Sequence, residues 1–175
     1  MIQRELSSLE HTVILSNLGD PVKIDDLKDY MSWQDIDTGA DSIEFEPVDF
    51  DHPLWLLYTS GTTGLPKPIV QGHGGILLEH FKTLSFHLDL KEEDRFFWFT
   101  TTGWMMWNML VSGLLLGTTV IMYDGSPIYP DSGVLWELAE EMKITYFGTS
   151  AAYLQACLKA GMSPADYLDL SSLRS

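Results

Sequence analysis

The sequence predicts an α/β fold, with a mostly parallel β-sheet and helices on both of its faces. Continuous apolar runs of three to five residues, typical of strands buried on both sides, recur along most of the chain. Segments whose apolar residues repeat at helical spacing lie between these runs. Strands and helices that alternate in this way form βαβ units, in which consecutive strands run parallel and helices cover the sheet.

The expected elements alternate from residue 54 onward. Strands are expected at residues 54–58, 96–99, 119–123 and 145–147. Helices are expected at residues 77–88, 104–116, 135–142 and 153–158, and the 104–116 helix is expected to be buried. Ser132 and Ser150 are expected N-caps, because a hydroxyl there accepts a hydrogen bond from a free backbone N–H. Gly161 is expected to follow the end of the last helix.

The chain divides by pattern into two parts. Residues 1–50 form an acidic lead-in with one short strand expected at residues 11–15, just before the turn signal Asn-Leu-Gly-Asp. Residues 51–175 carry the regular βαβ pattern.

Charge and cysteine content exclude several classes of function. The 175 residues include 10 Lys and Arg against 25 Asp and Glu, which gives a formal charge of −15. We therefore expect neither nucleic acid nor an anionic membrane surface as a partner, because both require a basic footprint. The single cysteine, Cys157, excludes an internal disulfide framework. No apolar leader opens the sequence, and we expect a cytoplasmic location.

The segment from Tyr58 to Lys67, Tyr-Thr-Ser-Gly-Thr-Thr-Gly-Leu-Pro-Lys, carries the strongest chemical signal. Its glycines allow tight turns that present backbone N–H groups to an anion, and its hydroxyl side chains add further donors. Lys67 is the only lysine or arginine between Lys28 and Lys82. An isolated lysine in a donor-rich loop of an acidic chain predicts an anion-binding site.

The residues of this loop fit three other kinds of loop less well. An ordinary glycine- and threonine-containing turn would explain a lone Gly-x-x-Gly, but not the complete ten-residue string. A Walker A loop ends in Gly-Lys-Ser/Thr, whereas Lys67 lies between two prolines. A hydrolase nucleophile elbow requires Gly-x-Ser-x-Gly, and Ser60 is flanked at those positions by Tyr58 and Thr62.

The string resembles the phosphate loop of the adenylate-forming superfamily, which includes the acyl-CoA synthetases and firefly luciferase. Further segments that resemble this family are residues 72–75, 96–108, 123–127 and 147–151. The residues of these segments are most similar to those of the acetoacetate-activating branch of the acyl-CoA synthetases. The resemblance extends from about residue 51 to residue 174 and matches the first fifty residues poorly.

The resemblance implies that the chain is part of the N-terminal domain of an enzyme that joins a small carboxylic acid to coenzyme A. Acetoacetate is the acid that the resemblance implies. The acid attacks the α-phosphate of ATP, and the CoA thiol then attacks the acyl-adenylate. The residues implied for the ATP phosphates, with Mg²⁺, are Thr59, Ser60, Gly61, Thr62, Thr63, Gly64 and Lys67. The residues implied for the acyl and CoA pocket are Trp104, Met105, Met106, Gly148, Thr149 and Ser150. A non-catalytic nucleotide-binding module with the same loop is the alternative.

The family's adenine platform, Mg²⁺-binding glutamate, ribose-binding aspartate and catalytic lysine domain correspond to no segment of residues 1–175. We therefore expect these residues alone to be inactive and to contain no catalytic residue. A strand is expected to begin near Leu173 and to be cut short. The incomplete sheet would then leave an edge through which copies of the chain associate.

The spacing of the histidines bears on a metal site, and the position of the cysteine bears on a reactive thiol. His73, His80 and His87 recur every seven residues, which places neighbours ~10 Å apart along a helix, too far to chelate one ion. We expect no metal site among them, and we expect His80 and His87 to be surface or packing residues. Cys157 lies on an apolar helical stripe and is expected to fill the core.

Overall fold

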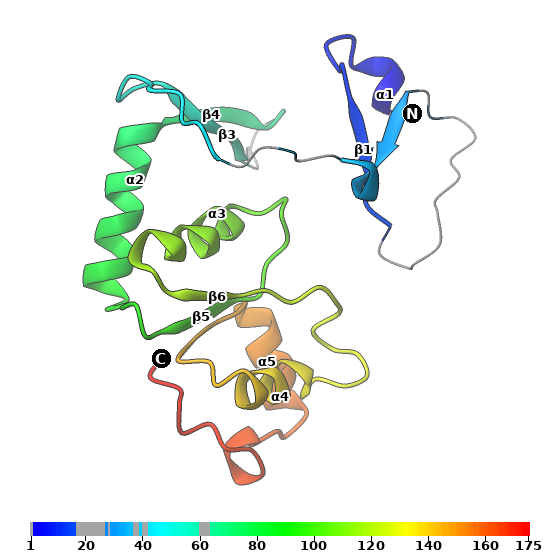
Figure 1. Ribbon diagram of the computed structural model, residues 1–175. Helices are drawn as coiled ribbons and strands as arrows, with labels where there is room; N and C mark the ends of the chain where they lie inside the picture. Colours follow the sequence, from blue (N-terminus) through cyan, green and yellow to red (C-terminus); the bar gives the residue numbers. More distant parts are fainter. Residues whose placement is uncertain (1, 17–26, 28, 37–38, 40–41, 60–63) are drawn as a thin grey trace. The chain divides into compact units, whose positions relative to one another are not determined.

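The computed structural model describes residues 2–16, 27, 29–36, 39, 42–59 and 64–175 (Figure 1). They fall into two units, Met1–Pro47 and Val48–Ser175. In the first unit, β1 (Thr12–Ile14) pairs in parallel with β2 (Tyr30–Ser32). The short helix α1 (Ile2–Glu5) precedes them, and the 3-10 helix η1 (Trp33–Asp35) follows. β1 lies within the expected strand, whereas the sequence pattern gave no indication of β2.

The second unit contains two sheets and the helices around them. Its strands are β3 (Pro53–Thr59), β4 (Lys67–Gly72), β5 (Arg95–Trp98), β6 (Thr119–Ile121) and β7 (Tyr146–Gly148). Its α-helices are α2 (His73–Lys82), α3 (Met105–Val111), α4 (Val134–Glu141) and α5 (Ala151–Lys159). Its other helices are the π-helix η2 (Thr83–His87) and the 3-10 helices η3 (Ser112–Leu116) and η4 (Pro164–Asp166).

The central sheet confirms the expected α/β architecture. Its strand order is β6-β5-β7, and both pairings are parallel. Side chains alternate between the two faces of β5, so Phe96 and Phe97 are buried in different cores. Phe97 packs among residues of α4 and α5, whereas Phe96 packs with Leu84 and with Leu110 of α3. Helices therefore cover both faces, as Figure 1 shows for α3 above the sheet and for α4 and α5 below it.

A buried carboxylate fastens the end of the described chain to this sheet. The side chain of Asp94 is 3 % exposed and accepts hydrogen bonds from Thr145 Oγ1 at 2.7 Å and from Arg174 Nη2 at 2.6 Å. The N–H of Arg174 also donates to the carbonyl of Thr145 at 2.8 Å, and the N–H of Phe147 donates to the carbonyl of Ser175 at 2.9 Å. Residues 174–175 therefore run beside β7, on the side away from β5.

The prediction that residues 54–58 form a buried strand of the parallel sheet is wrong. β3 pairs antiparallel with β4 in a separate two-stranded sheet, with Thr59 opposite Lys67 and Tyr58 opposite Pro68. Several of its side chains are exposed. The hairpin was missed because Pro68 breaks a strand pattern, although proline is tolerated in an edge strand.

The helix ends agree with the sequence in part. Ser150 is confirmed as an N-cap, because its Oγ accepts a hydrogen bond from Tyr153 N at 3.2 Å. Gly161 follows α5 with a φ of +68°, a left-handed conformation that favours glycine. Ser132 is not the cap of α4: Gly133 occupies that position, and its N–H donates to Asp131 Oδ1 at 2.7 Å.

The 104–116 segment forms α3 and η3, but it is only partly buried. Leu110, Ser112 and Gly113 are buried, whereas Leu114 and Leu115 are exposed. Within the described ranges, none of the helices is both long enough and apolar enough to cross a lipid bilayer.

Candidate functional site

Three segments converge at the carboxyl edge of the central sheet. The parallel strands β5, β6 and β7 end at the same edge, after Trp98, Ile121 and Gly148. The N–H of Phe99 donates to the carbonyl of Gly148 at 2.8 Å, and the ring of Phe99 lies 6.3 Å from that of Tyr123. Open parallel sheets bind their ligands at this edge.

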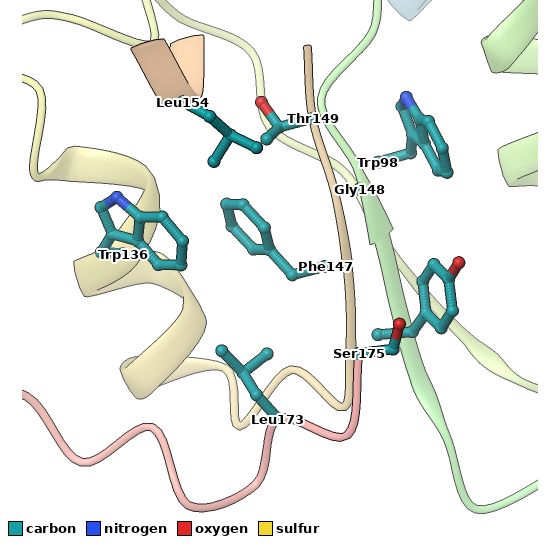
Figure 2. A pocket seen from close by; sticks show the side chains of 9 residues that line it. Trp98, Trp136, Phe147, Gly148, Thr149, Leu154, Leu173 and Ser175 are labelled. Carbon is teal, nitrogen blue, oxygen red and sulfur yellow. The ribbon is translucent and has the colours of Figure 1, made fainter. Parts of the chain in front are cut away.

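A cavity of about 400 Å³ lies along β7 (Figure 2). Its lining is mostly aromatic or aliphatic and comprises Trp98, Trp136, Tyr146, Phe147, Gly148, Thr149, Leu154, Leu173 and Ser175. Tyr146 and Phe147 are consecutive residues of β7 and so point to its opposite faces, and Figure 2 shows Trp98, from the neighbouring β5, across the strand from Phe147. A cavity lined from both faces of one strand lies at the edge of that strand.

Two polar side-chain atoms of this lining lack hydrogen-bond partners. Thr149 Oγ1 and Trp136 Nε1 are buried and make no hydrogen bond within the part of the chain that the structure describes. Trp136 is held by stacking on Phe147, with ring centroids 4.7 Å apart and an interplanar angle of 14°. A buried polar group without a partner costs about 1–3 kcal/mol, so both atoms favour a polar occupant nearby.

The residues expected to form the acyl and CoA pocket occupy different places. Gly148 and Thr149 line the cavity, and the Ser150 hydroxyl caps α5. Trp104 is the N-cap of α3 and is 65 % exposed, Met105 is 52 % exposed, and the half-buried Met106 follows in the first turn. The structure therefore brings Gly148 and Thr149 together but does not place Trp104, Met105 or Met106 in the cavity lining.

Gly148 allows a close approach that a larger residue would prevent. A Cβ atom at this position would lie 2.1 Å from the Trp98 ring, so the indole covers the end of β7 only because the side chain is absent. In the sequence, only the family resemblance marks Gly148 as a candidate site residue. This packing of glycine against tryptophan has no signature in the spacing of residues.

The expected phosphate loop connects the two strands of the β3–β4 hairpin. Ser60, Gly61, Thr62 and Thr63 lie outside the described residues. Thr59 ends β3 and Lys67 begins β4, directly opposite each other, and both are exposed with Gly64. The hairpin therefore fixes the two ends of the loop side by side and leaves Lys67 accessible to an anion.

Comparison with known proteins identifies the family. The model of the AMP-binding enzyme family matches residues 2–175. The chain belongs to the AMP-binding enzyme family. The resemblance found in the sequence is thereby confirmed, and the family match also includes the lead-in residues 2–50.

Relatives within the AMP-binding family include acetoacetyl-CoA synthetases. The enzyme of Rhizobium meliloti (strain 1021) is 52 % identical over 135 residues, which are 77 % of this chain and 21 % of the relative. The enzyme of Danio rerio is 44 % identical over 133 residues, which are 76 % of this chain and 20 % of the relative. This chain therefore spans about a fifth of the length of these curated relatives.

A solved structure from the same family supports the fold. The acetoacetyl-CoA synthetase from Streptomyces lividans superposes with a TM-score of 0.89 at 53 % identity. The match covers 98 % of this chain and 26 % of that protein.

Proposed function

We propose that the chain is part of an acid–CoA ligase that converts acetoacetate, ATP and coenzyme A into acetoacetyl-CoA. The observation that carries this proposal is the 53 % identity, at a TM-score of 0.89, to an acetoacetyl-CoA synthetase. A carboxylate oxygen of the acid bonds to the α-phosphorus of ATP, and pyrophosphate leaves. The CoA sulfur then bonds to the acyl carbon, and AMP leaves.

We assign the ATP phosphates to the hairpin loop, from Thr59 to Lys67. Backbone N–H groups, hydroxyls and one ammonium group stabilise the negative charge that develops as pyrophosphate leaves. Mg²⁺ would enter with ATP. The described residues contain no group of three His, Cys, Asp or Glu side chains that could hold a metal, so no step is assigned to a metal bound by them.

We assign the acid and the pantetheine arm of CoA to the carboxyl edge of the central sheet. Trp104, Met105 and Met106 lie where the segment after β5 enters α3. Gly148 ends β7, and Thr149 and Ser150 follow it. Exposed apolar side chains beside a sheet edge are suited to bind a short acyl chain. The single cysteine, which is buried and free, fits the reducing environment of the cytoplasm, and we propose that location.

Pyrophosphate exchange by the full-length protein tests this proposal. Exchange that depends on acetoacetate and exceeds exchange with acetate or hexanoate supports it. Absence of exchange with every acid, together with retained ATP binding, would contradict it and favour a non-catalytic nucleotide-binding module.

Replacing Trp104 or Met105 is expected to change the ranking of acids in the full-length protein. Side chains in a pocket wall discriminate by ~1–3 kcal/mol per methylene, so Met105→Ala should improve hexanoate relative to acetoacetate by about tenfold in kcat/KM. Exposed Leu158→Ala, in the last turn of α5, is the control. Equal loss for all acids would show that Trp104 and Met105 support the fold and do not contact the acid.

We also propose that residues 1–175, expressed alone, associate through the edge of β7. Residues 174–175 cover the part of this edge at Phe147, whose N–H donates to the carbonyl of Ser175, and strand alternation directs the N–H of Thr149 to the same side, one step further along the strand. Thr149→Pro, which removes that N–H, should lower the fraction of dimer measured by sedimentation velocity. A monomer at all concentrations would contradict this proposal, and Thr149→Ala, which keeps the N–H, is the control.

A further inference from the structure

One buried histidine joins the phosphate-loop hairpin to the helices on the central sheet. His80, in α2, is 7 % exposed, and its Nδ1 lies 2.6 Å from Ser112 Oγ in η3. The Ser112 hydroxyl donates its single hydrogen to the carbonyl of Asn108 at 2.8 Å. His80 Nδ1 must therefore carry a hydrogen and donate it to Ser112. Burial lowers the pKa of His80, which favours the neutral ring, and the contact with Ser112 then places its one hydrogen on Nδ1.

The same imidazole ring contacts the hairpin. Its centroid lies 5.7 Å from that of Trp55 in β3, at an interplanar angle of 39°. The Trp55 indole N–H donates to the Gln71 side chain, and these two residues face each other across β3 and β4. His80 is thus linked to one strand directly and to the other through Trp55.

The remaining attachment of the hairpin lies at the end far from the loop. There the N–H of His73 donates to the carbonyl of His52 at 2.9 Å, and the N–H of Gly74 donates to the carbonyl of Phe50 at 2.9 Å. Within the described ranges, Trp55–His80 is the only ring contact between β3 or β4 and the rest of the unit. Trp55 and Gln71 lie next to this base, beside the pair Pro53 and Gly72, so the His80 contact braces the base and restrains the angle at which the hairpin leaves it.

We propose that His80 is a positioning residue for the ATP phosphates. It sets the angle of the hairpin through Trp55, and Ser112 fixes the orientation of its ring. Thr59 and Lys67, a few residues beyond Trp55 on the two strands, are thereby held at one place relative to the carboxyl edge. This inference rests on the proposed function for the identity of the ligand, but the contact itself stands on the geometry. A leucine would fill a similar volume but would have neither the ring that contacts Trp55 nor the N–H that donates to Ser112.

Kinetics of the full-length protein test the proposal. His80→Leu should raise the KM for ATP in acetoacetate-dependent pyrophosphate exchange by about tenfold, because a small misplacement of binding groups weakens phosphate contacts. Transfer to CoA from pre-formed acetoacetyl-adenylate should change less than about twofold, since pyrophosphate has already left. His80→Asn, whose amide can donate to Ser112 in place of Nδ1 but which has no ring to contact Trp55, should not restore the wild-type KM. His87→Asn, at an exposed position of η2, is the matched control.

A spectroscopic measurement separates this inference from the proposed function. In protein labelled with 5-fluorotryptophan, the Trp55 resonance, assigned with Trp55→Phe, should shift in both His80→Leu and His80→Asn, because neither variant keeps the ring that contacts Trp55. If the protein shows no exchange but Trp55 responds in this way, the proposed function fails and the contact stands. An unchanged ATP KM, or equal losses in exchange and thiol transfer, would overturn the positioning role. If His80→Leu does not fold, Ser112→Ala, which removes only the hydroxyl, is expected to raise the ATP KM and decides the same question.

Discussion

Replacing Lys67 by alanine in the full-length protein is expected to slow acyl-adenylate formation by about 10²-fold and to leave thiol transfer nearly unchanged. Lys67 is exposed at the start of β4, so it contributes little to the fold and is free to contact phosphate. Only the first step expels pyrophosphate, so only that step loses the stabilisation of the leaving charge. Thr62→Ala should act in the same direction with a smaller effect, because it removes a neutral donor.

Pyrophosphate exchange measures the first step, and CoA-dependent consumption of pre-formed acyl-adenylate measures the second. Lys159→Ala, in the last turn of α5, removes one ammonium group far along the chain and is the control for net charge. Exchange by Lys67→Ala at the wild-type rate would show that the hairpin loop does not bind the phosphates.

Asp94→Asn is expected to lower the free energy of unfolding of this chain by about 2–3 kcal/mol at pH 7. One carboxylate oxygen accepts from Thr145 Oγ1 and Arg174 Nε, and the other accepts from Arg174 Nη2 and Lys91 N. An amide places NH₂ at one of these positions, where it meets two donors. Urea unfolding measured by circular dichroism gives the difference.

The free energy of unfolding that Asp94→Asn loses should become smaller in acid. Burial raises the pKa of Asp94, but hydrogen bonds from Thr145, Arg174 and the Lys91 backbone outweigh it, and the net pKa is lowered from 3.8. A lowered pKa in the folded state stabilises the protein above the unfolded-state value, and this contribution disappears as pH falls through the folded-state value. The difference between wild type and Asp94→Asn should therefore be full above about pH 4 and shrink in stronger acid.

Asp89→Asn is the matched control. The Asp89 carboxylate is exposed and also pairs with Arg174, with Oδ2 3.7 Å from Nη1. Exposed ion pairs contribute about 0–1 kcal/mol. Equal effects at Asp89 and Asp94, or a difference that does not change in acid, would contradict the role assigned to Asp94.

The sequence predicted the central sheet well because its signals are local. Each of the three strands is a short apolar run, and Ser150 and Gly161 mark the ends of α5 by backbone requirements that neighbouring residues cannot change. Cys157 is buried as its apolar stripe indicated. These features depend on a few adjacent residues.

The features that were missed depend on residues far apart in the chain. β3 has the apolar run of a buried parallel strand, and only its pairing with β4 shows it to be half of a hairpin. Ser132 has the chemistry of a cap, but its carbonyl accepts a hydrogen bond from the Tyr153 hydroxyl at 2.7 Å, and Gly133 occupies the cap position. His80 was expected at the surface or in packing, and its link to Ser112 spans 32 positions that no periodicity connects.

The central position of β5 has a consequence for how the chain folds as it leaves the ribosome. The hairpin joins residues such as Trp55 and Gln71, 16 positions apart, and can form as soon as β4 emerges. β5 can pair only after its neighbours have been synthesised: Phe97 pairs with Ile121 of β6 and with Phe147 of β7. The contact between Arg174 and Asp94 joins residues 80 positions apart. Because distant contacts close at greater entropic cost, β5 has two open edges early in synthesis and one until β7 appears. The Asp94–Arg174 pair then forms last, so its loss should speed unfolding more than it slows folding.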